Sequence, residues 1–459
     1  MSERRLFLLL FVILTISRLC HIPVMWPEET LPAAAGAQML WGSVLYRDAW
    51  FDKPPLLAAV YTLWGASDGW PLRIAGSLHA LLVCWLAYRM ARSHFDERVA
   101  RYAASAMAFF LIFDTPAVVM PLAADLLMVA PHLAAVWFAS TRRPLAAGVC
   151  AGIAFSINSK GLFVLAACAL WDLRALPMLA AGFAIPNALI GAWLVASGAW
   201  SSYVEQVWTW GRIYAADTFV ENPLAHGLRR SANWIGFHLA IAIPAVIALR
   251  KERRQWLAWV LVSIPAVVLG MRFFPRYYFQ LLPAFVILGA RGLTLIRPRH
   301  ALAIAALAVV PLIRFGPRYV QLASHGPAGW SDAAIDQDSR EAAAVIRAQS
   351  KSGDTLLVWG FRSEMLVYTG LRSGTRFLES QPLTGVAADR HLFNSKVIMP
   401  ELAERHRREL IAQQPDFIAD GLGPMNPALA ITSYPDLAEW LLRYEEIART
   451  SKTVIYKRR

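Results

Sequence analysis

The amino-acid sequence predicts an α-helical polytopic membrane protein with a small α/β domain at its C-terminal end. The chain of 459 residues is 57% hydrophobic and only 17% charged, whereas a soluble globular protein carries roughly 25% charged residues. Between Leu6 and about Phe315, long apolar runs alternate with short charged clusters, which is typical of several membrane spans. From about Arg318 onward, the composition is that of a soluble domain.

The length of each apolar run predicts the number of spans. A hydrocarbon core of about 30 Å needs about 20 apolar residues per helix, and spans of about 17 are common. By this measure the chain has about eleven spans. Those that begin at residues 145 and 161 are short, and would form a broken pair or a re-entrant hairpin. The candidate spans are residues 6–25, 72–91, 99–113, 122–140, 145–157, 161–173, 176–197, 232–249, 256–271, 274–292 and 300–316.

The arginines predict how these spans are oriented. With eleven spans, the main basic clusters all fall on one side, which the positive-inside rule assigns to the cytoplasm. The loops 26–71 and 198–231 and the chain from 317 onward then face outward. We therefore expect an inner-membrane protein with a transmembrane domain over 1–316 and a periplasmic or extracellular domain over 317–459. The clusters comprise Arg4, Arg5, Arg92, Arg98, Arg101, Arg142, Arg143, Arg174, residues 250–254, Arg291, Arg297 and Arg299.

Charge and cysteine content exclude several other classes of protein. The net charge of +13 is largely explained by basic groups that flank spans, so no nucleic-acid partner is expected. Cys20, Cys84, Cys150 and Cys168 all lie in apolar runs, which predicts neither a disulfide framework nor a cysteine metal site. The first apolar run resembles a signal peptide but has no small-residue cleavage site, so we expect an uncleaved helix.

The C-terminal domain has the pattern of a small α/β fold. Buried strands are expected at residues 354–359 and 416–419, with a last strand at 453–456. Helical spacing is found over residues 336–349, 401–414 and 436–447. No glycine-rich phosphate loop is present, because the run 421–424 has the composition of a turn.

The stretch 26–55 contains the densest group of candidate catalytic residues. Glu28 and Glu29 follow the first span, where a partly desolvated carboxylate would act as a general base towards a hydroxyl. The alternative is a solvated helix start, since Pro-Glu-Glu suits the first turn of a helix. Asp52 and Lys53 precede two prolines that fix the backbone, so Lys53 would hold a phosphate at the membrane edge. The alternative for Lys53 is an ordinary interfacial lysine.

Three further positions map to the same outer face. Asp125 lies at the outer end of the span 122–140, near the hydrocarbon, where an acid is either functional or a helix cap. Lys160 lies in the break between two short spans, which would line a cavity or form a plain tight turn. Arg276 and Tyr277 open a late span, where they would grip phosphate or a sugar face, or anchor the helix in an aromatic belt.

Taken in order, these motifs resemble the GT-C glycosyltransferase superfamily. The most similar members are the bacterial dolichyl-phosphate-mannose-protein mannosyltransferase-like and aminoarabinose-transferase-like enzymes. The resemblance covers roughly residues 1–300. It lies in Pro27-Glu28-Glu29, Leu45-Tyr46-Arg47-Asp48, Phe51-Asp52-Lys53-Pro54-Pro55, Asp125, Lys160-Gly161, and the run from Arg276-Tyr277 to Leu282-Pro283.

The resemblance implies a GT-C fold, a polyprenyl-phosphate sugar donor, and inverting transfer to a hydroxyl of a lipid, glycan or protein outside the membrane. The family's catalytic acid is often the aspartate of an Asp-Glu pair, so both Glu28 and Glu29 stay candidates. Asp52 and Asp125 would orient the acceptor or a metal. Some relatives use a divalent metal such as Mg, Mn or Zn and others do not, so a cofactor stays open. Donor-phosphate binding would fall to Lys53, Lys160, Arg276 and Tyr277.

Two other functions are compatible with a polytopic chain. A transporter or flippase of a lipid-linked sugar would also use broken helices and intramembrane charge, but it predicts two similar halves and charges near mid-span. The sequence shows neither pattern. A membrane-anchored binding protein would place the function in the C-terminal domain and leave the acidic and basic loop 26–71 unexplained.

Overall fold

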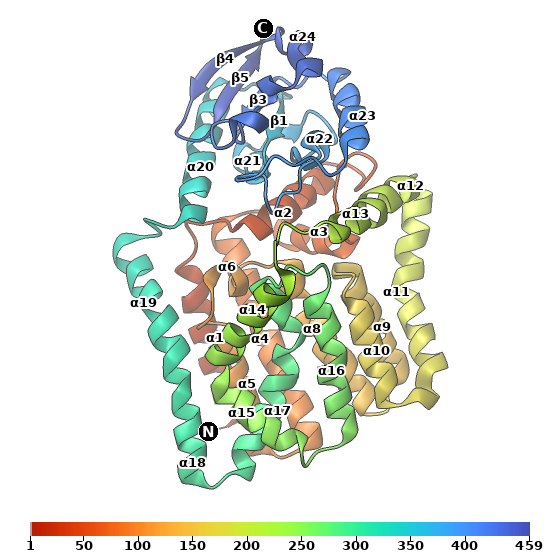
Figure 1. Ribbon diagram of the computed structural model, residues 1–459, viewed down its shortest axis with the longest axis vertical. Coiled ribbons are helices and arrows are strands. Elements are labelled where there is room, and N and C mark those ends of the chain that lie inside the picture. The colour runs from red at the N-terminus through yellow and green to blue at the C-terminus, as the bar shows by residue number, and fades with distance from the viewer. Residues whose placement is uncertain (1) are drawn as a thin grey trace.

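A computed structural model describes residues 2–459 as a bundle of helices with a smaller α/β domain at one end (Figure 1). The C-terminus lies at the far tip of this domain, and the N-terminus lies near the opposite end of the bundle. The main helices of the bundle are α1 (Glu3–Leu19), α4 (Gly69–His94), α5 (Glu97–Phe110), α8 (Val129–Ser140), α9 (Pro144–Ile157), α10 (Gly161–Trp171), α11 (Leu176–Ala196), α15 (Leu239–Leu249), α16 (Arg254–Val268), α17 (Leu282–Leu295), α18 (Pro298–Ala305) and α19 (Val309–His325).

Only some of these helices are long and apolar enough to cross a bilayer by themselves. Within residues 2–459, three stretches qualify: Gly69–His94, Leu173–Ala196 and Pro298–His325. A fourth is obtained if α14 (Pro223–Phe237) and α15, which meet at a bend of 94°, are taken together. The predicted count of about eleven spans is therefore not confirmed, and several predicted spans correspond to apolar helices of 10–17 residues. The last helix also runs to His325, beyond the end predicted at 316.

Small residues let neighbouring helices of the bundle approach closely. A Cβ atom on Gly148 of α9 would lie 2.1 Å from the carbonyl oxygen of Leu179 on α11. Likewise, a Cβ atom on Gly182 of α11 would lie 2.2 Å from the carbonyl oxygen of Leu145 on α9. Close backbone contact through glycine is the usual way in which helices associate where lipid removes the hydrophobic driving force. The two short predicted spans are two separate helices, α9 and α10, which are joined by a turn at residues 158–160.

The two long outward loops of the prediction are largely helical. Apart from α14, which crosses the front of the bundle, they form a layer between the bundle and the C-terminal domain (Figure 1). The first contains α2 (Pro27–Leu40) and α3 (Pro55–Tyr61); the second contains α12 (Trp200–Tyr203), a π-helical turn η3 (Val204–Thr209), α13 (Trp210–Ala216) and α14. α2 starts at this position because Pro27 occupies its first turn and Glu29 accepts a hydrogen bond from the Trp26 N–H at 3.2 Å.

The C-terminal domain is built on a mixed sheet of five strands in the order β2-β1-β3-β5-β4. β1 pairs in parallel with β2 and β3, whereas β5 pairs antiparallel with β3 and β4. The predicted strands correspond to β1, β3 and β5. The strands are β1 (Thr355–Trp359), β2 (Arg372–Ser373), β3 (Phe417–Asp420), β4 (Tyr444–Arg449) and β5 (Val454–Arg458), and the helices are α20 (Ser331–Gln349), α21 (Glu364–Thr369), α22 (Gln381–Thr384), α23 (Pro400–Ile411) and α24 (Ala438–Leu441).

The helix predicted over 436–447 is wrong in its second half. The helical turns end at Leu441, and residues 444–449 form β4 at the edge of the sheet. Tyr444 is buried while Glu445 and Glu446 are exposed. Pairing of β4 with β5 over Tyr444–Arg449 supplies backbone hydrogen bonds that a local helical pattern does not reveal.

The C-terminal domain packs directly on the stretch between α2 and α3. Trp50 donates its backbone N–H to the carbonyl of Arg376 at 2.6 Å, and its ring lies edge-on to His406 at 4.8 Å. Gln38 of α2 accepts a hydrogen bond from the backbone of Ser373 at 3.1 Å. Because Trp50 is fully buried in the hydrophobic core of the C-terminal domain, the two parts share one core at this junction.

Candidate active site

A cavity of about 1040 Å³ lies where the bundle, the helical layer and the C-terminal domain meet. Its walls come from α2, the turn before α3, the α9–α10 turn, η3 and α13, the segment 269–277, and several loops of the C-terminal domain. Of the predicted site residues, the structure brings these to the cavity: Glu28, Asp52, Lys53, Asp125, Lys160, Arg276 and Tyr277. Glu29 does not line it.

A chain of alternating charges crosses the cavity wall. Arg276 Nη1 lies 2.7 Å from Glu28 Oε1, and its Nε lies 3.6 Å from Asp125 Oδ2. The other oxygen of Asp125 accepts from Lys160 Nζ at 3.2 Å and from Asn158 Nδ2 at 3.2 Å. Four charges that are far apart in the sequence thus form one network, two acids alternating with two bases. Networks of this kind are strong where water is scarce.

Lys160 is the more deeply buried cation of the network. Its ammonium is buried and lies 3.0 Å from the centroid of the Tyr277 ring, a cation–π contact. Burial lowers the pKa of Lys160 to about 8, and the Asp125 carboxylate partly opposes that shift. The turn holds Lys160 in place because Asn158 Oδ1 accepts from its backbone N–H at 3.1 Å.

Asp52 and Lys53 form a second charged pair at the cavity. Lys53 Nζ lies 2.6 Å from Asp52 Oδ2, and 43% of the Lys53 side chain is exposed. The Tyr46 hydroxyl donates to the Lys53 carbonyl at 2.8 Å, so the backbone is held while the ammonium stays accessible. Asp52 Oδ1 is buried, and no hydrogen-bond partner for it is found among residues 2–459.

A buried glutamate of the C-terminal domain stands beside this pair. Glu379 is fully buried, with Oε1 accepting from Gln381 Nε2 at 3.0 Å. Its Oε2 has no hydrogen-bond partner in the described part of the chain. Burial raises the pKa of Glu379 well above its usual value, and the charge of Asp52 adds to the effect. Sequence reasoning missed Glu379, because nothing in the neighbouring residues distinguishes it from a surface acid.

Glu29 lies in a different environment from Glu28. Its two oxygens accept from Arg73 Nη1 at 2.9 Å and Nη2 at 2.7 Å, and Oε1 also accepts from the Leu122 N–H at 3.0 Å. Glu29 is fully buried, so its lone pairs are used within the protein. It connects the start of α2 to the segment that leads into Asp125.

Two arginines of the cavity, Arg212 and Arg272, are not among the predicted site residues. Arg212 on α13 is exposed, and no ion pair or side-chain hydrogen bond joins it to residues 2–459. Arg272 is buried and fully engaged: it donates to Asp389 Oδ2 at 2.7 Å and to the carbonyls of Tyr214 and Asp217, each at 2.6 Å. Arg212 is thus free to bind an anion, whereas Arg272 fastens the C-terminal domain to the α13 segment.

The backbone around Arg272 is unusual. Met271 and Phe273 have φ values of 52° and 51°, a conformation that residues with a Cβ rarely adopt. Each such residue stores about 1–3 kcal/mol of strain, which the surroundings must offset. The buried ion pair with Asp389 and the two carbonyl contacts of Arg272 are the interactions that hold this turn.

The residues present do not form an evident metal site. Over residues 2–459, no group of three or more histidine, cysteine, aspartate or glutamate side chains has an arrangement that would hold a metal ion. Proteins normally hold a divalent ion with several ligands. Asp52 and one neighbouring group would supply fewer than that.

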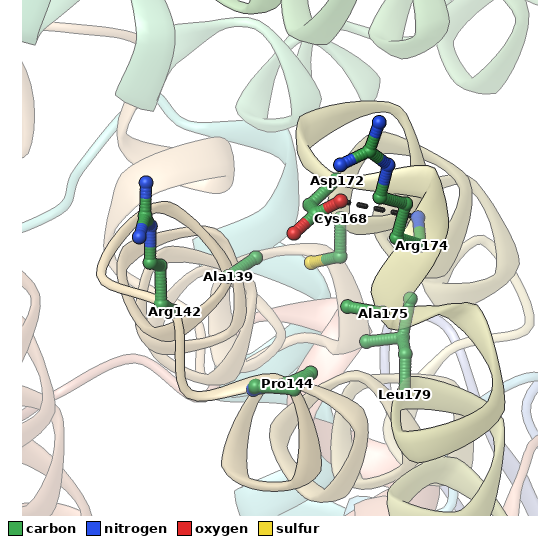
Figure 2. Close-up of a pocket in the computed structure, with 8 residues that line it drawn as sticks. All are labelled: Ala139, Arg142, Pro144, Cys168, Asp172, Arg174, Ala175 and Leu179. Carbon is green, nitrogen blue, oxygen red and sulfur yellow. Dashed lines mark hydrogen bonds between the residues drawn. The ribbon is translucent and has the colours of Figure 1, made fainter.

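A second cavity of about 460 Å³ lies at the opposite ends of α9 and α10 (Figure 2). Arg142 and Arg174 stand at its rim, with the Asp172 carboxylate between them in this view. Asp172 accepts a hydrogen bond from the backbone N–H of Arg174 at 3.1 Å. None of the predicted site residues lines this cavity, so the larger one is the candidate active site.

Comparison with protein families supports the resemblance inferred from the sequence. The family model described as dolichyl-phosphate-mannose-protein mannosyltransferase matches residues 52–200. The match begins at Asp52 and includes Asp125 and Lys160, while Glu28 and Arg276 lie outside it. No curated protein sequence matches the chain significantly.

Solved structures share the fold over nearly the whole chain. ArnT from Cupriavidus metallidurans bound to undecaprenyl phosphate matches with a TM-score of 0.63 at 15% identity, covering 98% of this chain and 97% of that one. The apo state of the same protein matches with a TM-score of 0.60 at 16% identity, covering 99% and 98%. The chain therefore has an ArnT-like fold, and its resemblance to the GT-C glycosyltransferases is confirmed.

Proposed function

We propose that this protein is an inverting membrane glycosyltransferase. It transfers a sugar from a polyprenyl-phosphate donor to a hydroxyl of a lipid, glycan or protein at the outer face of the inner membrane. The observation that carries the proposal is the charge network Glu28–Arg276–Asp125–Lys160 in the wall of the large cavity. The undecaprenyl phosphate bound in the ArnT structure is in keeping with such a donor.

The cations of the cavity take the donor phosphate. Lys53 is half-exposed and Arg212 is unpaired within the described chain, so both are available to phosphate oxygens without breaking a buried contact. Arg276 is suited to two parallel hydrogen bonds to phosphate, and Lys160 adds a buried point charge. As the bond between the sugar C1 and the phosphate oxygen breaks, its electron pair stays on the phosphate. These four cations stabilise the charge that develops there.

Glu28 serves as the general base. The acceptor hydroxyl passes its proton to Glu28 while its oxygen forms the new bond to C1, on the face opposite to the leaving phosphate. This in-line geometry inverts the configuration at C1. Without substrate, Glu28 is paired with Arg276 at 2.7 Å. A phosphate that draws Arg276 away would leave Glu28 free to accept the proton, so donor binding would switch on the base.

The other acids position these groups. Asp125 fixes Lys160 and approaches Arg276, and Asp52 restrains Lys53. Glu29 is used by Arg73 and by backbone donors, which favours a structural role and leaves Glu28 as the base. The C-terminal domain contributes Phe361, His391 and other side chains to the cavity wall, and we assign the acceptor to that wall.

Mass spectrometry of cell-surface glycans and lipids tests the proposal. A strain that lacks the gene should lose one sugar modification, and the wild-type gene should restore it. Glu28→Gln should fail to restore it although the protein is present in the membrane at normal level. Glu445→Gln, on the exposed edge strand far along the chain, is the matched control and should restore it fully. Full restoration by Glu28→Gln would reject the glycosyltransferase assignment and favour a flippase, which needs no base.

A further inference from the structure

Exposed apolar side chains are unevenly distributed over the C-terminal domain. Between residues 331 and 459, the exposed large hydrophobic side chains are Leu392, Phe393, Val397 and Leu442. Three of these four fall within residues 392–397, here called the apolar loop, and Phe393 is 68% exposed. A soluble surface that gathers its exposed hydrophobic residues in one short loop usually marks an interaction site.

The apolar loop lies beside the helical layer of the membrane domain. The Phe393 ring is 5.9 Å from the Phe219 ring, edge-on. Lys396 Nζ lies 3.0 Å from Asp217 Oδ1, and Arg390 also pairs with Asp217. These contacts fasten the loop to the segment that leads directly into α14.

α14 has the features of a helix that lies in a membrane interface. It meets α15 at 94°, so if α15 runs through the membrane, α14 lies close to the membrane plane. In Figure 1, α14 runs obliquely across the front of the bundle, below the level of α13. Leu224 and Leu228 are 67% and 65% exposed and stand one turn apart on the same face. Arg229 and Arg230 are exposed on the sides of α14 that point away from that face, and their long side chains would reach lipid phosphates.

We infer that the apolar loop and α14 together form a membrane-contact surface, with the loop dipping into the outer leaflet. The occupant is the phospholipid of that leaflet, because the surface is continuous with the lipid-facing side of the bundle. The cations on the flanks of α14 also complement anionic head groups. No carboxylate lies within α14 to oppose this attraction.

The contact sets the depth of the cavity mouth. Leu392 and His391 line the cavity, while the adjacent Phe393 faces outward. A loop anchored in the leaflet would therefore hold the cavity at the level where the phosphate of a membrane lipid lies. This consequence rests on the proposed function, whereas the membrane contact itself does not.

Photocrosslinking from single positions tests the contact directly. p-Benzoylphenylalanine would replace Phe393, Leu224 or, as the matched control, Leu442, which is 72% exposed but lies in the C-terminal domain beyond the apolar loop. The full chain is placed in nanodiscs of phosphatidylethanolamine and phosphatidylglycerol and irradiated, and the adducts are weighed by intact-protein mass spectrometry. Positions 393 and 224 should yield phospholipid adducts at least severalfold more often than position 442.

The outcomes separate the possible occupants. A covalent dimer from position 393 would show that a second copy covers the loop, and would overturn the inference. An adduct yield at 393 no higher than at 442 would also overturn it, because the loop would then face water. The readout needs no catalysis, so it stands even if the sugar-transfer experiment fails. If the membrane contact and the proposed sugar transfer are both confirmed, Phe393→Asp should raise the KM for a long-chain donor in bilayers severalfold. The KM for a water-soluble short-chain donor should stay unchanged.

Discussion

Replacing Asp125 by asparagine should make the proposed sugar transfer decline at a lower pH than in the wild type. Asp125 is the only carboxylate in the described chain that is paired with Lys160, at 3.2 Å. Two unit charges at that separation attract by about 5 kcal/mol if the effective dielectric constant is about 20. Asparagine has nearly the same size and retains one oxygen for Asn158, so the substitution removes charge rather than volume.

The expected magnitude follows from burial. Breaking a buried pair by removing one partner costs about 3–5 kcal/mol. Part of that penalty disappears because Lys160 sheds its proton. In the wild type, the pKa of Lys160 is lowered to about 8, with Asp125 opposing the shift. Without Asp125 it falls further, so the variant holds a neutral Lys160 near pH 7.5. Losing one charged contact to phosphate, worth about 1.5–3 kcal/mol, would slow transfer about tenfold to a hundredfold.

The assay is the pH dependence of kcat/KM for sugar transfer. Wild-type activity should fall as the pH rises through about 8, because Lys160 is charged only below that value. In Asp125→Asn the same fall should occur at lower pH, and activity at acid pH should partly recover. Asp172→Asn, at the opposite end of α10, is the control and should keep the wild-type profile. An unchanged alkaline limb in Asp125→Asn would refute the assignment of Lys160 as a phosphate ligand tuned by Asp125.

Four further predictions separate catalytic from structural roles. Glu28→Gln should lower kcat by about 10²- to 10⁴-fold with undecaprenyl phosphate binding retained, and loss of binding instead would contradict a role as base. Glu29→Gln should destabilise the fold by about 3–5 kcal/mol through unpaired Arg73, seen as a lower Tm; an unchanged Tm would contradict this. Lys53→Ala should weaken binding of undecaprenyl phosphate about tenfold or more by isothermal titration, and unaltered affinity would exclude it as a ligand. Because the pKa of Glu379 is raised in the folded protein, the stability of the wild type should decline as the pH rises above about 4.5. Glutamine does not titrate, so the Tm of Glu379→Gln relative to the wild type should increase between pH 5 and pH 8. A difference in Tm that does not change with pH would argue against a protonated Glu379.

Local sequence pattern was sufficient where structure depends on neighbouring residues. The break at 158–160 between two apolar runs, the helix start at Pro27, and the strands at β1, β3 and β5 all follow from residues within a few positions. The local pattern was insufficient where contacts between distant parts of the chain decide the secondary structure. Residues 444–449 have a helical pattern but pair with β5, and the stretch 26–71, predicted as a loop, contains helices α2 and α3 beneath the C-terminal domain.

The sequence alone determined which chemical groups this protein could use. It placed acids and cations in loops at the ends of apolar helices, and its motif order resembles that of the GT-C glycosyltransferases. Only the tertiary structure decided which of them meet. Glu28 and Glu29 are neighbours in sequence, but successive side chains on a helix point about 100° apart, so one turns to Arg276 and the cavity and the other to Arg73 and the core. An ion pair between Glu28 and Arg276 depends on how the whole bundle packs, and no local pattern specifies that distance.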